Sequence, residues 1–441
     1  MAKKDSGIRS NSLVNISENK IGIIGDNILR NGSILTAYYI LPLANYSVTS
    51  ENGVLNNVEA LTGTLTNLAN QRPGVSFSLQ KISKVIRAQD VYNNLMQTIQ
   101  MYKPDYDMPE EFTSHISDNR QNYCLLGVDI QQTDMSNVED YSAADTIKEL
   151  MNSAIGRLFG SGNYDLDLEK IVAIENNIYN AIRSRCVRAT RDLVFYNYVS
   201  KLYPSYEISY DKQSYFTDEN FSAALGIVNQ TVEDNFGYFT LHNEGVDFFD
   251  LPSQPTYGCI LDVKSFPKMI YSSNFPYNYE GVQIQVNIQT LRKEDAEIQI
   301  KRRRSSDKYD LESAITAGAE SEDIQQTAES ISYATEALAD ISNGMIFCKF
   351  NTSILVYANT LEQLRRNTQT VISISRDRDI LVSKSLTQAT DFMNSFVKLV
   401  PTTYNHMAAL QFPLSFQLNS GAIVGGFDSK FFLPSIGEAI E

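Results

Sequence analysis

The chain contains no tryptophan, three histidines and four cysteines among its 441 residues. The cysteines are Cys124, Cys186, Cys259 and Cys348, and the histidines are His115, His242 and His406. No two cysteines have the close spacing of a zinc site or of a small disulfide framework. The histidines are equally scattered, so the sequence predicts no metal site, no cofactor and no histidine-based catalytic triad. A reduced, cytosolic setting fits this pattern best.

Long apolar runs and an excess of positive charge are also missing. A membrane-spanning helix needs about 20 apolar residues, whereas the longest run here, at residues 34–43, is shorter and includes Thr36. The basic segment at residues 1–15 is followed by no apolar stretch, so no secretory signal is predicted. Lys and Arg number 37 against 52 Asp and Glu, and the formal charge of −15 opposes general coating of nucleic acid.

What the chain does have is length, apolar content and tyrosine. A domain usually takes about 100 to 200 residues, so the length predicts two to four units. Hydrophobic residues make up 43%, which is enough for a sizeable core. Many of the 25 tyrosines lie in polar segments, where a phenol can bury its ring and keep its hydroxyl in water. This indicates surface made for contact.

Residues 1–140 predict a first α+β unit. Residues 21–43 read as two strands joined at Asn31-Gly32, a pair that tolerates the positive φ of a hairpin turn. Residues 55–68 place an apolar residue at every third or fourth position, as on one helical face. Residues 75–79 and 123–130 predict two further strands. Strands with a helix packed on them form the expected lobe.

Residues 141–256 predict a mainly helical middle region. Apolar residues from Leu168 to Ile182 recur at helical spacing, a second helix continues toward Pro204, and another is expected at residues 220–233. Four arginines crowd the junction: Arg183, Arg185, Arg188 and Arg191. Charged side chains usually stay exposed or pair with acidic neighbours, so we favour a solvated face over a partner contact.

Residues 257–441 predict a second α+β lobe. A strand begins at Cys259, and residues 282–290 alternate apolar and amide side chains, as in a half-buried strand paired with residues 296–300. A helix at residues 324–341 ends at Asn343-Gly344, and residues 345–357 form a buried strand. Thr360 is expected to cap the next helix, and a last helix with Leu386 in its apolar stripe ends before Pro401. The predicted fold is α+β, with two mixed sheet-and-helix lobes and a helical insertion.

The most basic segment of the chain lies between the predicted strand pair at residues 282–300 and the predicted helix at residues 324–341. It consists of Lys301, Arg302, Arg303 and Arg304. The plainer interpretation is a charged, mobile linker beside an acidic segment. The sharper one is an interaction patch that contacts nucleic acid or lipid headgroups.

The candidate catalytic motifs in the sequence are incomplete. Gly421 and Gly426 have the spacing of a phosphate-binding loop, but Phe427 stands where lysine is required. Ser395 and Lys398 form an S-x-x-K pair, but the other parts of that signature are absent or in reversed order, which indicates a chance match. We therefore expect no catalytic residue in this chain.

Several segments nevertheless look familiar. Residues 343–367 read NGMIFCKFNTSILVYANTLEQLRRN, residues 382–401 read VSKSLTQATDFMNSFVKLVP, and the chain begins with a hairpin containing AYYILP at residues 37–42. Together they resemble the amino-terminal region of the conjugative-transfer ATPases of type IV secretion systems, the TraC and CagE class. In that family this region assembles the motor and docks it on the cytoplasmic face of the inner-membrane channel. The ATP-hydrolysing module would begin just beyond Gly425-Gly426, and this chain ends at Glu441.

The resemblance implies an assembly and docking domain, not an enzyme. Its expected partners are other copies of itself and secretion-channel proteins, with a peripheral position at the cytoplasmic membrane, and the sequence gives no strong evidence for direct binding of nucleic acid. The alternative is a phage or mobile-element structural protein built from the same lobes, which the tyrosine- and asparagine-rich residues 271–281 favour. Coupling-protein and relaxase genes beside this one would favour conjugation, and capsid and tail genes the alternative.

Overall fold

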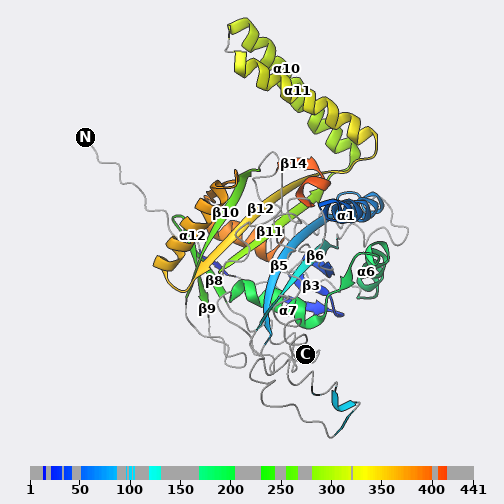
Figure 1. Ribbon diagram of the computed structural model, residues 1–441, viewed down its shortest axis with the longest axis vertical. Coiled ribbons are helices and arrows are strands. Elements are labelled where there is room, and N and C mark those ends of the chain that lie inside the picture. The colour runs from blue at the N-terminus through cyan, green and yellow to red at the C-terminus, as the bar shows by residue number, and fades with distance from the viewer. Residues whose placement is uncertain are drawn as a thin grey trace, which may run out of the picture.

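The computed structural model describes the parts of the chain in which the strands and helices lie (Figure 1). They are residues 13–15, 21–31, 34–41, 51–86, 96, 99–101, 103–104, 119–130, 168–203, 230–243, 255–266, 281–318, 321–399 and 406–414. Helices and a large antiparallel sheet make up this part, so the predicted α+β class is confirmed.

The fourteen strands found in the described residues belong to one open sheet. Its main path runs β1 (Leu13–Asn15), β8 (Gln230–Asn235), β9 (Tyr238–Asn243), β10 (Thr256–Ser265), β12 (Phe347–Ala358), β11 (Val282–Thr290), β5 (Ser76–Ile86), β6 (Asn119–Asp129), β4 (Ile34–Leu41), β3 (Ile28–Asn31) and β2 (Ile21–Ile24). Three short strands pair beside this path: β13 (Leu381–Lys384) with β10, β14 (His406–Ala409) with β12, and β7 (Val187–Arg188) with β4.

The strands predicted for two lobes meet within this sheet. β5 belongs to the first predicted lobe and β11 to the second, and they pair antiparallel with Phe77 opposite Ile288 and Gln80 opposite Gln285. The two lobes therefore share one continuous set of backbone hydrogen bonds.

The amino-terminal strands form one turn more than predicted. Asn31 pairs with Ile34, as expected for a hairpin at Asn31-Gly32. A second hairpin precedes it, with Ile24 opposite Ile28. Gly25 opens that turn at a φ of 59°, a conformation that residues with a Cβ rarely adopt. Residues 21–41 are thus three strands and not two.

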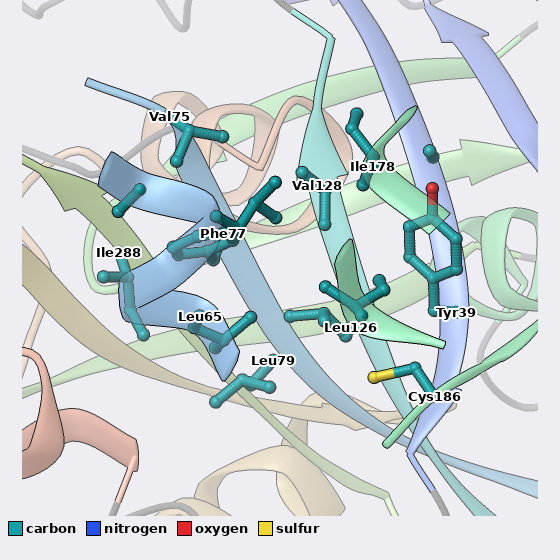
Figure 2. Close-up of a cluster of buried hydrophobic side chains, with 14 of the residues drawn as sticks. Tyr39, Leu65, Val75, Phe77, Leu79, Leu126, Val128, Ile178, Cys186 and Ile288 are labelled. Atoms are coloured by element: carbon teal, nitrogen blue, oxygen red, sulfur yellow. The ribbon is translucent and has the colours of Figure 1, made fainter. Parts of the chain in front are cut away.

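One face of the sheet is covered by α1 (Glu51–Gln71) and α6 (Leu168–Ile182). Their predicted apolar faces are buried, with Leu65 and Ile178 fully enclosed. Figure 2 shows these two side chains with Phe77 and Leu79 of β5, Leu126 and Val128 of β6, and Tyr39 of β4. Burial of one such side chain is worth about 1.5 to 3 kcal/mol, so this cluster is a main source of stability.

The helix α12 (Leu361–Arg376) extends the covering of the same face over β10 and β12. The predicted cap is present, because the Thr360 hydroxyl accepts a hydrogen bond from the Gln363 backbone amide at 3.3 Å. Leu364 and Val371 are buried against Ile354. The sequence pattern of this segment therefore predicts both where the helix starts and which side it buries.

The opposite face is covered by α7 (Arg191–Leu202), α13 (Gln388–Phe392) and a π-helical turn at Met393–Val397. Phe392 and Phe396 pack here as predicted. Leu386 does not join them, because it precedes α13 and its side chain is 85% exposed. Leu399 takes a φ of 59°, which ends the helical run before Pro401.

Two other predictions are wrong. The expected helix at residues 220–233 is contradicted at its end, where β8 and β9 form a hairpin whose turn contains Gly237 at a φ of 80°. Val232 of this hairpin is buried opposite Leu241, so packing across the strands overrides the local helical signal. Residues 220–229 lie outside the described part of the chain. The strand expected at residues 296–300 is the start of a long helix.

Candidate functional site

A helical hairpin projects from the sheet, far from the rest of the body (Figure 1). It consists of α10 (Lys293–Ala317) and α11 (Ser321–Ser342). α10 has 25 residues, which at 1.5 Å per residue is roughly 37 Å. Glycines end both helices, Gly318 at a φ of 70° and Gly344 at 92°, as is typical of helix C-termini.

The two helices touch along a narrow seam. Ala296 and Ile300 of α10 and Ala334 and Ile341 of α11 are the buried residues of this pair. They pack with Phe347 at the base of the hairpin, beside the sheet. Farther out, the Ser330 hydroxyl donates a hydrogen bond to Asp307 Oδ2 at 2.6 Å. The described residues of the outer half include no fully buried side chain, and its seam consists of half-buried residues such as Leu311 and Ile331 beside this polar contact.

The predicted basic patch lies in the middle of α10. Lys301, Arg302, Arg303 and Arg304 are helical, so the prediction of a mobile linker is wrong. Lys301 pairs with Glu297 at 2.7 Å, and Arg303 lies 4.0 Å from Asp307, both one helical turn away. Arg304 is half-buried and faces the seam, while Arg302 is exposed. The sequence suggested a linker because α10 has too few apolar residues at its seam positions beyond Ile300 for a helical stripe to be recognised.

Charge is distributed unevenly over the hairpin. α11 contains five carboxylates and no basic residue: Glu322, Asp323, Glu329, Glu336 and Asp340. The exposed large apolar side chains are Ile298, Tyr309 and Ile315 on α10 and Tyr333 on α11, and both tyrosines are more than 60% exposed. Aromatic side chains in this position are typical of contact surfaces.

A second group of polar side chains is buried under the π-helical turn. They are Ser78 and Gln80 on β5, Gln285 and Asn287 on β11, Asn351 and Ser353 on β12, and Asp262 on β10. They lie in register across the strands, as in the row Asp262, Ser353, Gln285 and Gln80. We call this set the polar belt. Gln285 and Asn287 were expected on an exposed strand face, and that expectation is wrong because the π-helical turn covers them.

The polar belt holds backbone in place. The side-chain amides of Gln285 and Asn287 both donate to the Ser395 carbonyl in the π-helical turn, the latter at 3.1 Å. The Ser395 hydroxyl lies 3.5 Å from Asn351 and 3.4 Å from Ser353. Among the described residues no contact joins Ser395 to Lys398, and the Ser395 side chain is buried. A π-helical turn leaves carbonyls that need such donors.

One lysine of α7 is also buried on this side of the sheet. Lys201 is 4% exposed, and burial lowers the pKa of its ammonium group to about 7. The neighbouring Asn197 has an amide without a hydrogen-bond partner. Removing an amine from water without an opposite charge favours its neutral form.

Two of the four arginines clustered in the middle region make structural contacts. Arg188 contacts the buried Glu175 through two nitrogens, at 2.9 and 2.8 Å, and lies over the ring of Tyr179. Arg191 donates to the Gly25 carbonyl at 2.7 Å. Arg183 and Arg185 are exposed. Pairing with acidic neighbours was among the expectations for this cluster, and it holds for Arg188.

A metal site receives no support from the described residues. Within them, no three histidine, cysteine or carboxylate side chains come together to hold a metal ion. His242 pairs with Glu233, and His406 contacts the Val263 carbonyl. His115 and residues 421–430 lie outside the described ranges. None of the described helices has both the length and the apolar character that a membrane span requires.

Comparison with family models and with curated proteins gives no match for this chain.

Proposed function

We propose that this chain is an assembly and docking component of a conjugative type IV secretion machine, corresponding to the non-motor region of its ATPase. It works by positioning other proteins, and it sits peripherally on the cytoplasmic side of the inner membrane. The projecting α10–α11 hairpin is the observation that carries this proposal.

The hairpin contributes little to the stability of the sheet. Beyond Ile300 and Ala334, the described side chains of both helices are exposed or half-buried. Isolated helices of this kind are marginal in water, because ordering the chain costs about as much as the helical hydrogen bonds return. An element that adds so little to the core is best explained by a partner that its outer surface binds.

The polar belt supports a positioning role rather than catalysis. Its side chains fix the π-helical turn against the sheet, and they lie beneath covering helices. A catalytic group needs contact with a substrate and a partner that adjusts its protonation. The proposal accordingly assigns ATP hydrolysis to another module.

The test uses the tagged chain expressed with the proteins encoded beside it. A matched variant lacks residues 301–336 and joins Ile300 to Ala337 through a short Gly-Ser turn. These positions face each other, since Ser330 contacts Asp307 across the antiparallel pair. We expect the intact chain, and not the variant, to co-purify with channel and motor proteins of a secretion system.

Two results would overturn the proposal. Co-purification with capsid or tail proteins would favour the alternative, a phage or mobile-element structural protein. Turnover of ATP by the isolated chain would make it an enzyme. Cooperative thermal unfolding of the variant shows that its sheet is intact, so a loss of binding can be assigned to the hairpin.

A further inference from the structure

The buried side of α7 carries three polar side chains toward the sheet. Asn197, Tyr198 and Lys201 are 0%, 2% and 4% exposed, and residues three or four positions apart lie on the same side of a helix. Val194 and Leu202 of the same helix belong to the apolar core on this side of the sheet. Polar groups enclosed in this way destabilise a protein unless each of them has a partner.

The described residues do not supply those partners. Neither the nitrogen nor the oxygen of the Asn197 amide has a hydrogen-bond partner, and the Tyr198 hydroxyl has none. Burial lowers the pKa of the Lys201 ammonium group to about 7, and no carboxylate among the described residues opposes this shift. Buried amides and hydroxyls are almost always hydrogen-bonded in native proteins, so each such group requires an explanation. A bound molecule on this side of α7 would provide one for all three side chains.

The sheet beneath α7 contributes a hydroxyl and an amide to the same place. Tyr38 of β4 lies opposite Gly127 of β6, and a Cβ at Gly127 would lie 3.4 Å from the Tyr38 ring, so the lack of a side chain there leaves room for that ring. Burial raises the pKa of the Tyr38 hydroxyl, and the nearby side chains of Gln80 and Asn197 partly offset that rise. Burial also raises the pKa of the Tyr198 hydroxyl, and the nearby Tyr38 adds to that rise. The Gln80 amide oxygen has no hydrogen-bond partner, so polar groups of β4, β5 and α7 converge here.

The chemistry of these groups indicates a small anion. A long side chain on a helix leans toward the helix N-terminus, so the Lys201 ammonium group lies toward the turn that holds Asn197 and Tyr198. An ammonium group, an amide N–H and a phenol O–H are all donors, and the oxygens of a phosphate or carboxylate group accept from each of them. Water could satisfy the amide and the hydroxyl, but it carries no charge to balance the ammonium group. A buried positive charge beside two neutral donors therefore favours an oxyanion.

We propose that α7 and the sheet enclose a binding site for a small oxyanion, either a phosphate or a carboxylate group. Lys201 neutralises its charge, and Asn197 and Tyr198 donate hydrogen bonds to its oxygens. Tyr38 and Gln80 lie beneath it on β4 and β5. In Figure 1, α7 lies at the end of the body away from the α10–α11 hairpin, so a negative result leaves the proposed docking function unaffected. A bound anion would fix α7 on the sheet, because it connects the helix to both strands.

The experiment titrates the whole chain with inorganic phosphate and, separately, with acetate. Thermal unfolding and isothermal titration calorimetry are recorded in chloride buffer at constant ionic strength. Lys201→Met removes the charge and keeps most of the length of the side chain, and Lys308→Met, which replaces an exposed lysine of α10, is the matched control. We expect Lys201→Met to weaken binding at least about 10-fold, because the charged donor is lost. Lys308→Met should bind like wild type.

A second variant, Asn197→Leu, tests the amide. Leucine has nearly the same size, and the change removes both amide atoms that have no partner. Replacement of an unpartnered buried polar group by an apolar one is neutral or stabilising, so in chloride buffer Asn197→Leu should unfold at or above the wild-type temperature. It should bind the anion about 3- to 10-fold more weakly. A purely structural residue would instead lower the unfolding temperature and leave the affinity unchanged.

The difference between wild type and Lys201→Met is decisive, because phosphate also stabilises folded proteins by being excluded from their surface. If Lys201→Met weakens the response, saturable binding of phosphate alone identifies a phosphate group, of acetate alone a carboxylate, and of both their shared oxyanion chemistry. Two results would overturn the inference. One is no saturable response of wild type to either ion, which would assign the polar groups to buried water. The other is equal affinity of wild type and Lys201→Met for the ion.

Discussion

Replacement of Glu175 by alanine should destabilise the amino-terminal half of the sheet more than any exposed charge change. Glu175 lies on α6, and its carboxylate accepts hydrogen bonds from Asn27 and from the Tyr39 hydroxyl, both at 3.0 Å, besides the contact with Arg188. Glu175, Asn27 and Tyr39 are buried, whereas the Arg188 side chain is 37% exposed. The carboxylate therefore joins α6 to β4 and to the turn before β3.

The magnitude follows from the groups that lose their acceptor. A buried polar group left without a hydrogen bond costs about 1 to 3 kcal/mol, and the Tyr39 hydroxyl becomes such a group. The Asn27 amide loses one acceptor but keeps its hydrogen bond to the Tyr38 carbonyl at 3.2 Å, so its share is about 1 kcal/mol. Arg188 can turn toward water, so its share is at most about 1 kcal/mol. We expect a loss of about 2 to 4 kcal/mol in the free energy of unfolding.

The assay is guanidinium unfolding followed by far-ultraviolet circular dichroism. The control is Glu362→Ala, which removes an exposed carboxylate that pairs with Arg366 on α12 and should cost at most about 0.5 kcal/mol. Adding Tyr39→Phe to Glu175→Ala should recover part of the loss, because the orphaned hydroxyl is removed. Equal effects of Glu175→Ala and Glu362→Ala would refute the reasoning.

Two further predictions concern buried positions. Lys201 is charged in the unfolded chain below a pKa near 10.4 and has a folded pKa of about 7; its burial penalty is therefore full below pH 7 and declines as the pH rises to about 10. Lys201→Met should remove this pH dependence and stabilise the protein by up to about 4 kcal/mol at pH 7. The free energy of unfolding of both proteins is measured at pH 7 and at pH 9.5. A difference between variant and wild type that is the same at both pH values would contradict the prediction. Gly258→Ala should destabilise by about 1 to 3 kcal/mol, because a methyl group there would overlap the Phe239 ring. Thermal unfolding measures this loss of stability. Adding Phe239→Leu to Gly258→Ala should restore part of it, and no recovery would show that the overlap is not the cause.

Local patterns predict many of the elements. The stripe from Val58 to Leu68 predicts the buried side of α1, and Thr360 predicts the start of α12. Such signals depend on neighbours three or four positions away, which the sequence displays directly. The same is true of the hairpin at Asn31, whose turn residues define its type.

Features that depend on distant contacts could not be predicted in this way. The pairing of Gln80 with Gln285 is set by register across the sheet and leaves no local trace. Asn287 looked exposed because an amide in an alternating strand usually faces water, and only the Ser395 carbonyl above it explains its burial. The basic patch was identified by composition, but its place on a projecting helix depends on the seam with α11.

The β5–β11 pair has a consequence for how the protein is made. The two strands are separated by about 200 residues, which a ribosome adds in roughly 10 to 40 seconds at typical rates of synthesis. During that interval β5 presents an open edge of backbone donors and acceptors, beside side chains such as Phe77. Nascent chains in this state invite pairing with other strands, so a chaperone that shields residues 76–86 until β11 emerges would raise the yield of native protein.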